Sequence, residues 1–319
     1  MATILVTGIA GFIGSHVSKT LLKRGDQVIG IDNFNSYYDP KLKEDRIKKF
    51  LKGLSPKIYR VSINNQTELK KVFAENKIDK ICHLAAQAGV RYSLENPNVY
   101  IESNILGTHY LLELAREYNI KDFVFASSSS VYGGNKKIPF SEADPVDQPI
   151  SLYAATKKAN ELEAYVYHHL FNLSIIGLRF FNVYGPWGRP DMALFKFVKA
   201  ILADQPIDVY NYGKMKRDFT YIDDIVSGAV AAIDHCQNYQ IINLGNNEPI
   251  DLEDFIKTIE ENLGKEAQKN YLPLQIGDVV ETYADIRKAK KILSWKPKTD
   301  INEGIKNFIS WYKDYYHIH

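Results

Sequence analysis

The stretch VTGIAGFIGSHV, residues 6–17, decides the fold class. It places Gly8, Gly11 and Gly14 at GxxGxxG spacing, directly after the apolar run TILVT (3–7). Glycines at this spacing allow a tight turn and a close backbone approach to a pyrophosphate, whose charge the N-terminus of the following helix stabilises. A tight turn without a ligand would also use glycines. The position between a strand and a helix, at the start of the chain, favours a dinucleotide-binding unit.

A second apolar run, QVIGID (27–32), ends in Asp32. A carboxylate at the end of the second strand can accept a hydrogen bond from the ribose 2′-hydroxyl and repel a 2′-phosphate. No arginine follows it directly, since the sequence continues NFNSYY. We therefore predict NAD rather than NADP as the cofactor.

Short β-branched runs and longer helical segments alternate through the first half of the chain. The expected strands are 3–7, 27–32, 57–61, 80–85, 122–126 and 173–180, with helices from 11, from about 66, over 98–118 and from 151. Near-continuously apolar strands in such an alternation indicate a parallel sheet covered by helices on both faces. We predict an α/β protein with a Rossmann-type, doubly wound parallel sheet.

After residue 180 the pattern loosens into the turn-rich stretch FFNVYGPWGRPDMA. Helical patterns follow at 193–205, 223–236, 251–264 and 302–316, and strand patterns at 207–211 and 240–245. We predict an NAD-binding domain over 1–180, to which the chain returns near 221–245. The remainder of 181–319 is expected to form a smaller, interleaved C-terminal α/β substrate domain.

The composition bounds the partners and the compartment. The chain has 319 residues, 45% hydrophobic and 24% charged, with a formal net charge of +2, so neither nucleic acid nor an anionic membrane is expected as a partner. No apolar stretch reaches the roughly 18 residues that span a bilayer. We expect a soluble cytoplasmic protein without a metal site, and Cys82 as a buried thiol. The basic stretch KLKEDRIKKFLKGLSPK from Lys41 is expected to be a solvated amphipathic helix rather than a phosphate-binding patch.

Tyr153 and Lys157 form a YxxxK pattern on the helix expected from 151. Positions i and i+4 share one helix face, and a nearby ammonium lowers a phenol pKa from its reference value near 10. A positive nicotinamide ring should lower it further. A phenolate poised near neutrality is a good base for a sugar hydroxyl. We predict Tyr153 as the base and Lys157 as its activator and as a ligand of the nicotinamide ribose.

Four serines, Ser127 to Ser130, follow the run DFVFA (122–126). In parallel α/β sheets ligands bind beyond the carboxyl ends of the strands, where these serines fall. A serine there can donate to, or relay a proton from, the oxygen that Tyr153 reaches. One or two of them could instead cap the backbone of a strand-end loop, and that role is expected chiefly of Ser130.

Taken together, the motifs TGIAGFIG, HLAAQAGV, SSSSVYG, YAATK and RFFNVYGP resemble the extended short-chain dehydrogenase/reductase family. They span most of the chain in the expected order. The blocks DNFNSYYDPKLKEDR, GVRYSLENP, VYGPWGRPDMALF, GKMKRDFTYIDDI and LQIGDVVETYADI resemble the UDP-glucuronate 4-epimerase subgroup. Several of these blocks lie outside the shared cofactor machinery.

The resemblance implies roles for individual residues. Besides the glycines, Asp32, Tyr153 and Lys157, it implies cofactor contacts from Phe12, Ile13, Asn33, Ser62, Ile63, Leu84, Ala85, Ala86, Asn104 and Ser127. It implies substrate contacts from Ser127, Ser128, Ser129, Asn182, Arg189, Val209, Tyr210, Arg217, Gln275 and Asp278, with Ser128 as the catalytic partner of Tyr153. The role of Arg91 stays open.

Two positions depart from the subgroup. Asn182 stands where threonine is expected, and Ser62 where an aspartate would hold the adenine. Asparagine at 182 is typical of sugar-nucleotide epimerases more broadly. It leaves a neutral or N-acetylated UDP-hexose as the alternative substrate.

The resemblance implies an NAD-dependent isomerase that converts UDP-glucuronate to UDP-galacturonate through a transient 4-keto sugar. Related dehydratases and uronate decarboxylases carry an acidic residue in the segment that is all serine here, so elimination or decarboxylation is disfavoured. A catalytically silent NAD-binding scaffold should have a broken glycine loop or YxxxK pattern, and both are intact.

The family resemblance also implies a homodimer built on two helices per subunit, near 98–118 and from 151. The apolar residues that could form this interface could equally belong to the core. They are Tyr110, Leu111, Leu114, Tyr165, Tyr167 and Leu170.

Overall fold

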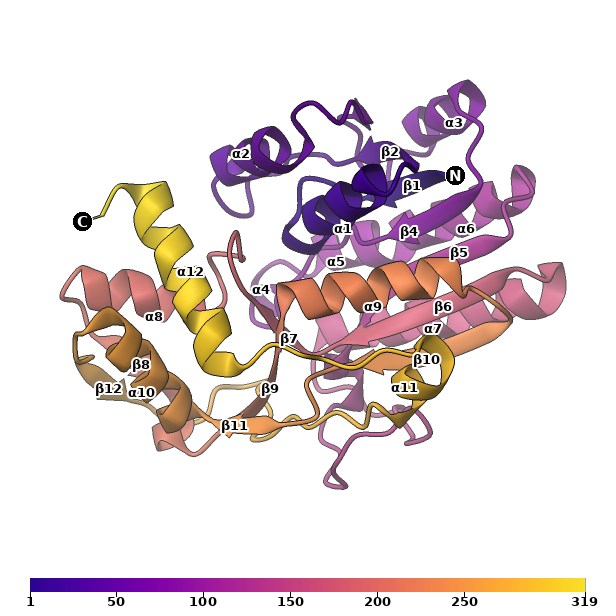
Figure 1. Ribbon diagram of the computed structural model, residues 1–319. Coiled ribbons are helices and arrows are strands. Elements are labelled where there is room, and N and C mark those ends of the chain that lie inside the picture. Colours follow the sequence, from indigo (N-terminus) through magenta and orange to yellow (C-terminus); the bar gives the residue numbers. More distant parts are fainter. Residues whose placement is uncertain (319) are drawn as a thin grey trace.

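A seven-stranded parallel sheet forms the centre of the computed structural model, which describes residues 1–318 (Figure 1). Its strand order is β10-β6-β5-β4-β1-β2-β3, and every neighbouring pair is parallel. The strands are β1 (Thr3–Thr7), β2 (Gln27–Ile31), β3 (Lys57–Tyr59), β4 (Lys80–His83), β5 (Asp122–Ser128), β6 (Ser174–Phe180) and β10 (Tyr239–Leu244).

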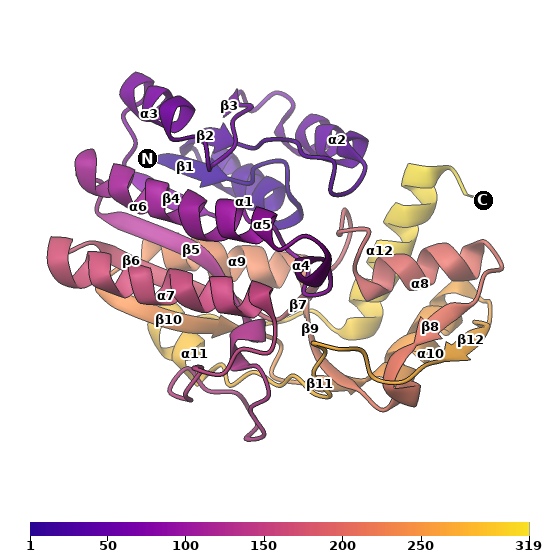
Figure 2. The same cartoon turned by 180° about the vertical axis from the view of Figure 1, so that it is seen from behind.

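Helices cover both faces of this sheet. Helices α1 (Phe12–Lys23) and α9 (Ile222–Asp234) pack together on the face turned to the viewer in Figure 1. Helices α3 (Gln66–Glu75), α6 (Gly107–Glu117) and α7 (Leu152–Phe171) cover the other face, seen in Figure 2. Along β1, Ile4 and Val6 belong to one buried cluster and Leu5 to the other, because side chains alternate between the faces of a strand. The predicted doubly wound fold is confirmed.

A smaller α/β part lies beside one end of the sheet (Figure 1). It has a three-stranded sheet, β11-β9-β7, and a two-stranded sheet, β12-β8. Its elements are β7 (Asn182–Tyr184), α8 (Ala193–Leu202), β8 (Ile207–Val209), β9 (Lys216–Tyr221), β11 (Pro249–Asp251), α10 (Leu252–Leu263), β12 (Lys269–Tyr271) and α12 (Ile301–Tyr316). Helix α11 (Arg287–Leu293) packs against β10 and α9 of the larger part. The predicted domain limits stay a prediction.

Two of the sequence-based boundaries shift at the site. Strand β5 continues past residue 126, so that Ser127 and Ser128 pair with Arg179 and Phe180 of β6. The next residues, Ser129–Tyr132, form a 3-10 turn. The helix expected over 98–118 is interrupted: α5 (Asn98–Tyr100) runs into a π-helical turn at Ile101–Leu106 before α6 begins. Helix α4 (Tyr92–Glu95) precedes it.

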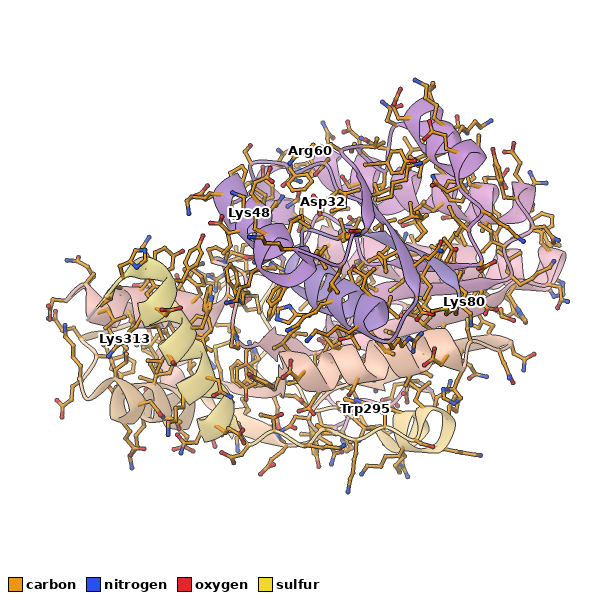
Figure 3. All side chains as sticks on the ribbon, turned by 45° about the horizontal axis from the view of Figure 1, so that its top comes forward. Asp32, Lys48, Arg60, Lys80, Trp295 and Lys313 are labelled. Carbon is orange, nitrogen blue, oxygen red and sulfur yellow. The ribbon has the colours of Figure 1, made fainter. Side chains whose placement is uncertain are left out.

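Helix α2 (Pro40–Leu51) forms where a solvated basic helix was predicted. Asp39 caps its N-terminus and Pro40 occupies the first helical position, as is common at helix starts. Lys48 is exposed and is labelled in Figure 3. Lys43 and Arg46, however, are buried. The helix is amphipathic as predicted, but these two cations are not solvated, because oxygen atoms inside the fold accept their hydrogen bonds.

Both cysteines are buried thiols, as predicted for Cys82. Across residues 1–318, no helix is long and apolar enough to cross a membrane. In the same part of the chain, no group of His, Cys, Asp and Glu side chains is arranged to hold a metal ion. A cytoplasmic location stays a prediction.

Candidate active site

A cleft of about 940 Å³ lies between the carboxyl ends of the sheet strands and the smaller α/β part. It brings together most of the residues predicted from the sequence. Its lining includes Gly8, Gly11, Phe12, Ile13, Gly14, Asp32, Asn33, Ile63, Leu84, Ala85, Ala86, Ser127, Ser128, Ser129, Tyr153, Lys157, Asn182, Arg189, Tyr210, Arg217 and Asp278. Four predicted residues lie outside this lining: Ser62, Asn104, Val209 and Gln275.

The glycine loop is closed so tightly that side chains are excluded from it. Gly8 has φ +72°, and a Cβ there would lie 2.9 Å from the backbone nitrogen of Ala85. The N–H of Gly11 donates to the carbonyl of Gly8 at 2.9 Å, and a Cβ on Gly14 would collide with that same carbonyl oxygen. Helix α1 then starts without a side-chain cap, so its first N–H groups face the cleft, as a diphosphate requires. The loop therefore fits the pyrophosphate of NAD.

Asp32 organises the same loop from the end of β2 (Figure 3). Its Oδ2 accepts the N–H of Ala10 at 3.0 Å, and its Oδ1 accepts the N–H of Phe34 at 2.8 Å. Burial raises the pKa of this carboxyl, and the two N–H donors and the charge of Lys43 act against that rise. Next to it, Asn33 donates to the hydroxyl of Ser62 at 3.4 Å.

Asn104 lies behind the cleft, in the π-helical turn. Its side chain accepts the N–H of Gln87 at 2.8 Å and donates to the carbonyl of Gln87 and to the hydroxyl of Thr156. It thereby fastens the loop after β4 to helix α7. Val209 is buried in the apolar core, while the Oε1 of Gln275 is buried without a hydrogen-bond partner among residues 1–318.

Helix α7 carries Tyr153 and Lys157 to the end of β5. The hydroxyl of Ser151 accepts the N–H of Ala154 at 3.1 Å, which starts the helix just before Tyr153. Lys157 donates from Nζ to the carbonyl of Ala126 at 2.8 Å, and burial lowers its pKa to about 8.

The pKa of Tyr153 is raised above its ordinary value by burial, against the opposing effects of the Ser128 hydroxyl and the Arg189 guanidinium. The lowering of the phenol pKa that is predicted from Lys157 together with a positive nicotinamide ring stays a prediction for the complex with NAD. Burial outweighs the charges, and the ammonium of Lys157 is directed to a backbone carbonyl.

The first two serines of the run have opposite hydrogen-bonding roles. Ser127 donates its proton to Glu161 at 2.7 Å, so its oxygen can only accept from a ligand. Ser128 instead accepts the N–H of Ser130 at 3.1 Å, which leaves its own proton to donate toward Tyr153. The loop cap expected of Ser130 is thus provided by Ser128, because β5 extends to that residue.

Glu161 is itself held by a buried ion pair that the sequence analysis did not find. Arg179 on β6 donates from Nε and Nη2 to its two carboxylate oxygens, both at 2.8 Å. Although burial raises the pKa of Glu161, Arg179 and Ser127 lower it more, so the group stays ionised. The available signal was spacing, since Glu161 follows Lys157 by one i to i+4 step on α7.

Arg189 faces the cleft from the loop after β7 and is paired with Asp191, which also lines the cleft. The hydroxyl of Tyr37 donates to Oδ2 of Asp191 at 3.1 Å. Burial raises the pKa of Asp191, but the charge of Arg189 lowers it further, so its net pKa is below the ordinary value. Neither Tyr37 nor Asp191 was predicted, because they meet only through the folding of distant loops.

Arg91 joins the far end of the cleft. Its Nη2 lies 3.0 Å from Oδ2 of Asp278, and its guanidinium stacks over the ring of Tyr210 at 4.5 Å. Nearby, Arg217 donates to the carbonyls of Lys216, Val279 and Val280, and burial lowers its pKa to about 10. This end therefore carries two guanidinium groups and an aromatic ring, which suit an anionic nucleotide.

The chain that forms this cleft matches a known protein family in sequence. A model of the NAD dependent epimerase/dehydratase family matches residues 4–245. The chain belongs to this family. Membership confirms the resemblance to the extended dehydrogenase/reductase family that the motifs indicated.

Relatives within the NAD dependent epimerase/dehydratase family are similar over almost the whole chain. The protein CapI of Staphylococcus aureus is 51% identical, over 98% of this chain and 99% of its own length. The UDP-glucuronate 4-epimerase of Thermodesulfobacterium geofontis is 48% identical, over 98% of this chain and 97% of its own length. The structure of UDP-glucuronic acid 4-epimerase from Bacillus cereus, in complex with UDP-glucuronic acid and NAD, superposes with a TM-score of 0.92. It is 38% identical and covers 98% of this chain and 100% of that one.

Proposed function

We propose that this protein is a UDP-glucuronate 4-epimerase that interconverts UDP-glucuronate and UDP-galacturonate with bound NAD. The observation that carries the proposal is similarity to such epimerases over 98% of the chain, including the region beyond residue 245 that the family model does not cover. That region contributes Asp278 to the cleft. The similarity therefore extends to the substrate side.

In the proposed reaction Tyr153 takes the proton of the sugar 4-hydroxyl and later returns it. Ser128 donates toward the phenol oxygen and so stabilises the phenolate. Lys157, held by the carbonyl of Ala126, adds a positive charge beside the cofactor side of the cleft. When bound along the glycine loop, NAD supplies the hydride acceptor that makes the 4-keto sugar possible. Because Ser128 lies on β5 and Tyr153 and Lys157 lie on α7, the packing of these two elements fixes the three side chains relative to one another.

The carboxylates near the reacting position are poor acids, which supports epimerisation over decarboxylation or dehydration. Segment 127–130 contains serines only. Asp191 is held ionised by Arg189, and Glu161 by Arg179. Neither carboxyl can therefore supply a proton to a leaving group at neutral pH.

Asn182 motivates the second candidate, a 4-epimerase of a neutral or N-acetylated UDP-hexose. It lines the cleft at the start of β7. Product analysis with UDP-glucuronate, UDP-glucose and UDP-N-acetylglucosamine separates the candidates. We expect the C4 epimer of UDP-glucuronate and no released CO₂. Turnover of a neutral sugar alone would reject the first proposal in favour of the second.

We also propose a homodimer in which α7 packs against a second copy. Leu162, Tyr165, Val166 and Leu170 are exposed at i, i+3, i+4 and i+8, a single apolar stripe on that helix. Of the other candidates, Leu111, Leu114 and Tyr167 are core residues, and Tyr110 is half-buried. Sedimentation of the wild type and of Leu170→Glu tests this. The variant should be monomeric, and an unchanged dimer would exclude this interface.

A further inference from the structure

Among residues 1–318, Arg46 on helix α2 is the largest side chain that is completely buried. It comes from a basic segment that the proposed reaction does not use. Its acceptors are backbone carbonyls and one phenol, rather than carboxylates. Burying a guanidinium costs free energy unless all its N–H donors find acceptors, so this position requires acceptors placed to match an arginine.

Four of the five hydrogen bonds of Arg46 reach two different loops, and the fifth reaches the hydroxyl of Tyr38 just before α2. Nε and Nη2 donate to the carbonyl of Trp187 at 3.0 and 2.8 Å, and Nη2 also reaches the carbonyl of Gly188 at 3.2 Å. Nη1 donates to the carbonyl of Ala10 at 3.2 Å and to the hydroxyl of Tyr38 at 2.6 Å. One planar group therefore bridges residue 10 to residues 187 and 188.

The two loops belong to the two sides of the cleft. Ala10 lies within the glycine loop, between Gly8 and Gly11, and donates its N–H to Asp32. Gly188 directly precedes Arg189, which lines the substrate side. Arg46 thus contacts the backbone of the cofactor loop and the backbone next to the arginine on the substrate side.

The loop at 187 needs such support. Trp187 has φ +64°, a left-handed conformation that residues with side chains rarely adopt. Two hydrogen bonds from Arg46 hold its carbonyl in place. The loop just before α2 makes a second contact with this region. Its Tyr37 donates a hydrogen bond to Asp191, which is the ion-pair partner of Arg189.

We propose that Arg46 is a positioning residue that couples the cofactor loop to the loop of Arg189, so that the dinucleotide site and the nucleotide end of the substrate site are held by one buried cation. This inference rests on the proposed function, because it takes UDP as the group that Arg189 helps to bind. It assigns no contact between Arg46 and the reacting atoms.

The test compares Arg46→Lys with the wild-type holoenzyme in the presence of saturating NAD. Lysine keeps the charge but has three donors on one atom and cannot span both loops. We expect the Kd of UDP, measured by calorimetry, and the KM of UDP-glucuronate to rise about tenfold, the size of one lost hydrogen bond from a charged donor. The value of kcat should change much less. The variant should also lose NAD faster than the wild type on gel filtration.

Arg60→Lys is the matched control. Arg60, labelled in Figure 3, is exposed over 60% of its side chain. It pairs with Glu44, which lies on the same helix as Arg46. Surface pairs of this kind contribute little, so its UDP affinity and NAD retention should equal those of the wild type.

An unchanged Kd of UDP in a folded Arg46→Lys variant would overturn the inference, and so would a change at only one of the two sites. If that variant does not fold, the Tyr38→Phe variant provides the test, because it removes only one hydrogen-bond acceptor of Arg46. It should raise the Kd of UDP about threefold, and no change would again overturn the inference. A wild-type protein that neither binds UDP nor epimerises UDP-glucuronate would instead refute the proposed function.

Discussion

The ion pair between Glu161 and Arg179 predicts a large loss of stability from a nearly isosteric change, Glu161→Gln. Both side chains are almost completely buried, with 1% and 2% of their surface exposed. The Nη1 of Arg179 already lacks a partner among residues 1–318, so no second acceptor is ready to take over. Breaking a buried pair from one side typically costs 3–5 kcal/mol, and because glutamine keeps one acceptor oxygen we expect about 3 kcal/mol.

The assay is thermal and urea-induced unfolding of Glu161→Gln beside Glu163→Gln. The control makes the same change on the same helix, at a carboxylate that is 23% exposed and pairs with His109 near the surface. For a chain of 319 residues, about 3 kcal/mol corresponds to a fall in Tm of roughly 4–5 °C. The control should stay within about 0.5 kcal/mol of the wild type.

The pH dependence gives an independent check. The folded-state pKa of Glu161 lies below its ordinary value of 4.5, so the stabilisation from its charge is present above that pH. It is lost as the pH falls through the folded-state pKa. The stability gap between wild type and Glu161→Gln should therefore be full at pH 7 and shrink below about pH 4.5. A Glu161→Gln variant as stable as Glu163→Gln, or a gap that persists unchanged into acid, would refute this reasoning.

Three further predictions concern the cleft. Gly14→Ala places a Cβ against the carbonyl of Gly8, so the Kd of NAD in equilibrium dialysis should rise about tenfold or more. Lys157→Met should lower kcat but raise the unfolding free energy at pH 7 by up to about 3 kcal/mol, because burial lowers the lysine pKa from 10.5 to about 8. That gain should disappear as calorimetry is carried from pH 8 to above about 10.5, where lysine becomes neutral in the unfolded state as well. Tyr153→Phe should lower kcat at least about 100-fold with UDP affinity unchanged, and a smaller loss would deny the tyrosine its role as base.

Local sequence patterns predicted the fold and the cofactor side because their physics is local. The glycine loop depends on steric contacts within a few residues, and Tyr153 and Lys157 depend on one helical turn. Most strands of the main sheet were found because burial on both faces makes them apolar, although the edge strand β3 is only partly buried. By contrast, β7, β9, β11 and β12 were missed, since strands of only three to six residues carry little pattern of their own.

Contacts between distant segments set the limits of the prediction. An amphipathic pattern cannot show that Arg46 turns inward, because its acceptors are carbonyls at residues 10, 187 and 188. The same holds for Tyr37, which meets Asp191 only in the folded protein. Spacing likewise predicts that a charge lies near Tyr153 but does not measure the burial that raises the pKa of this phenol.

After β7, α8, β8 and β9 of the smaller part, the chain returns to the main sheet, and this order affects how the chain can be divided. Helix α9 and strand β10 follow β9 in sequence, yet both belong to the main sheet. Helix α9 packs beside α1 on one face, and β10 is the edge strand next to β6. A polypeptide ending at residue 180 would leave β6 as an open edge and strip the apolar cover from α1, conditions that favour aggregation. We therefore do not expect a fragment that ends at residue 180 to fold as an independent domain. The chain passes between the main sheet and the smaller part several times, so the two walls of the cleft are covalently joined at more than one point.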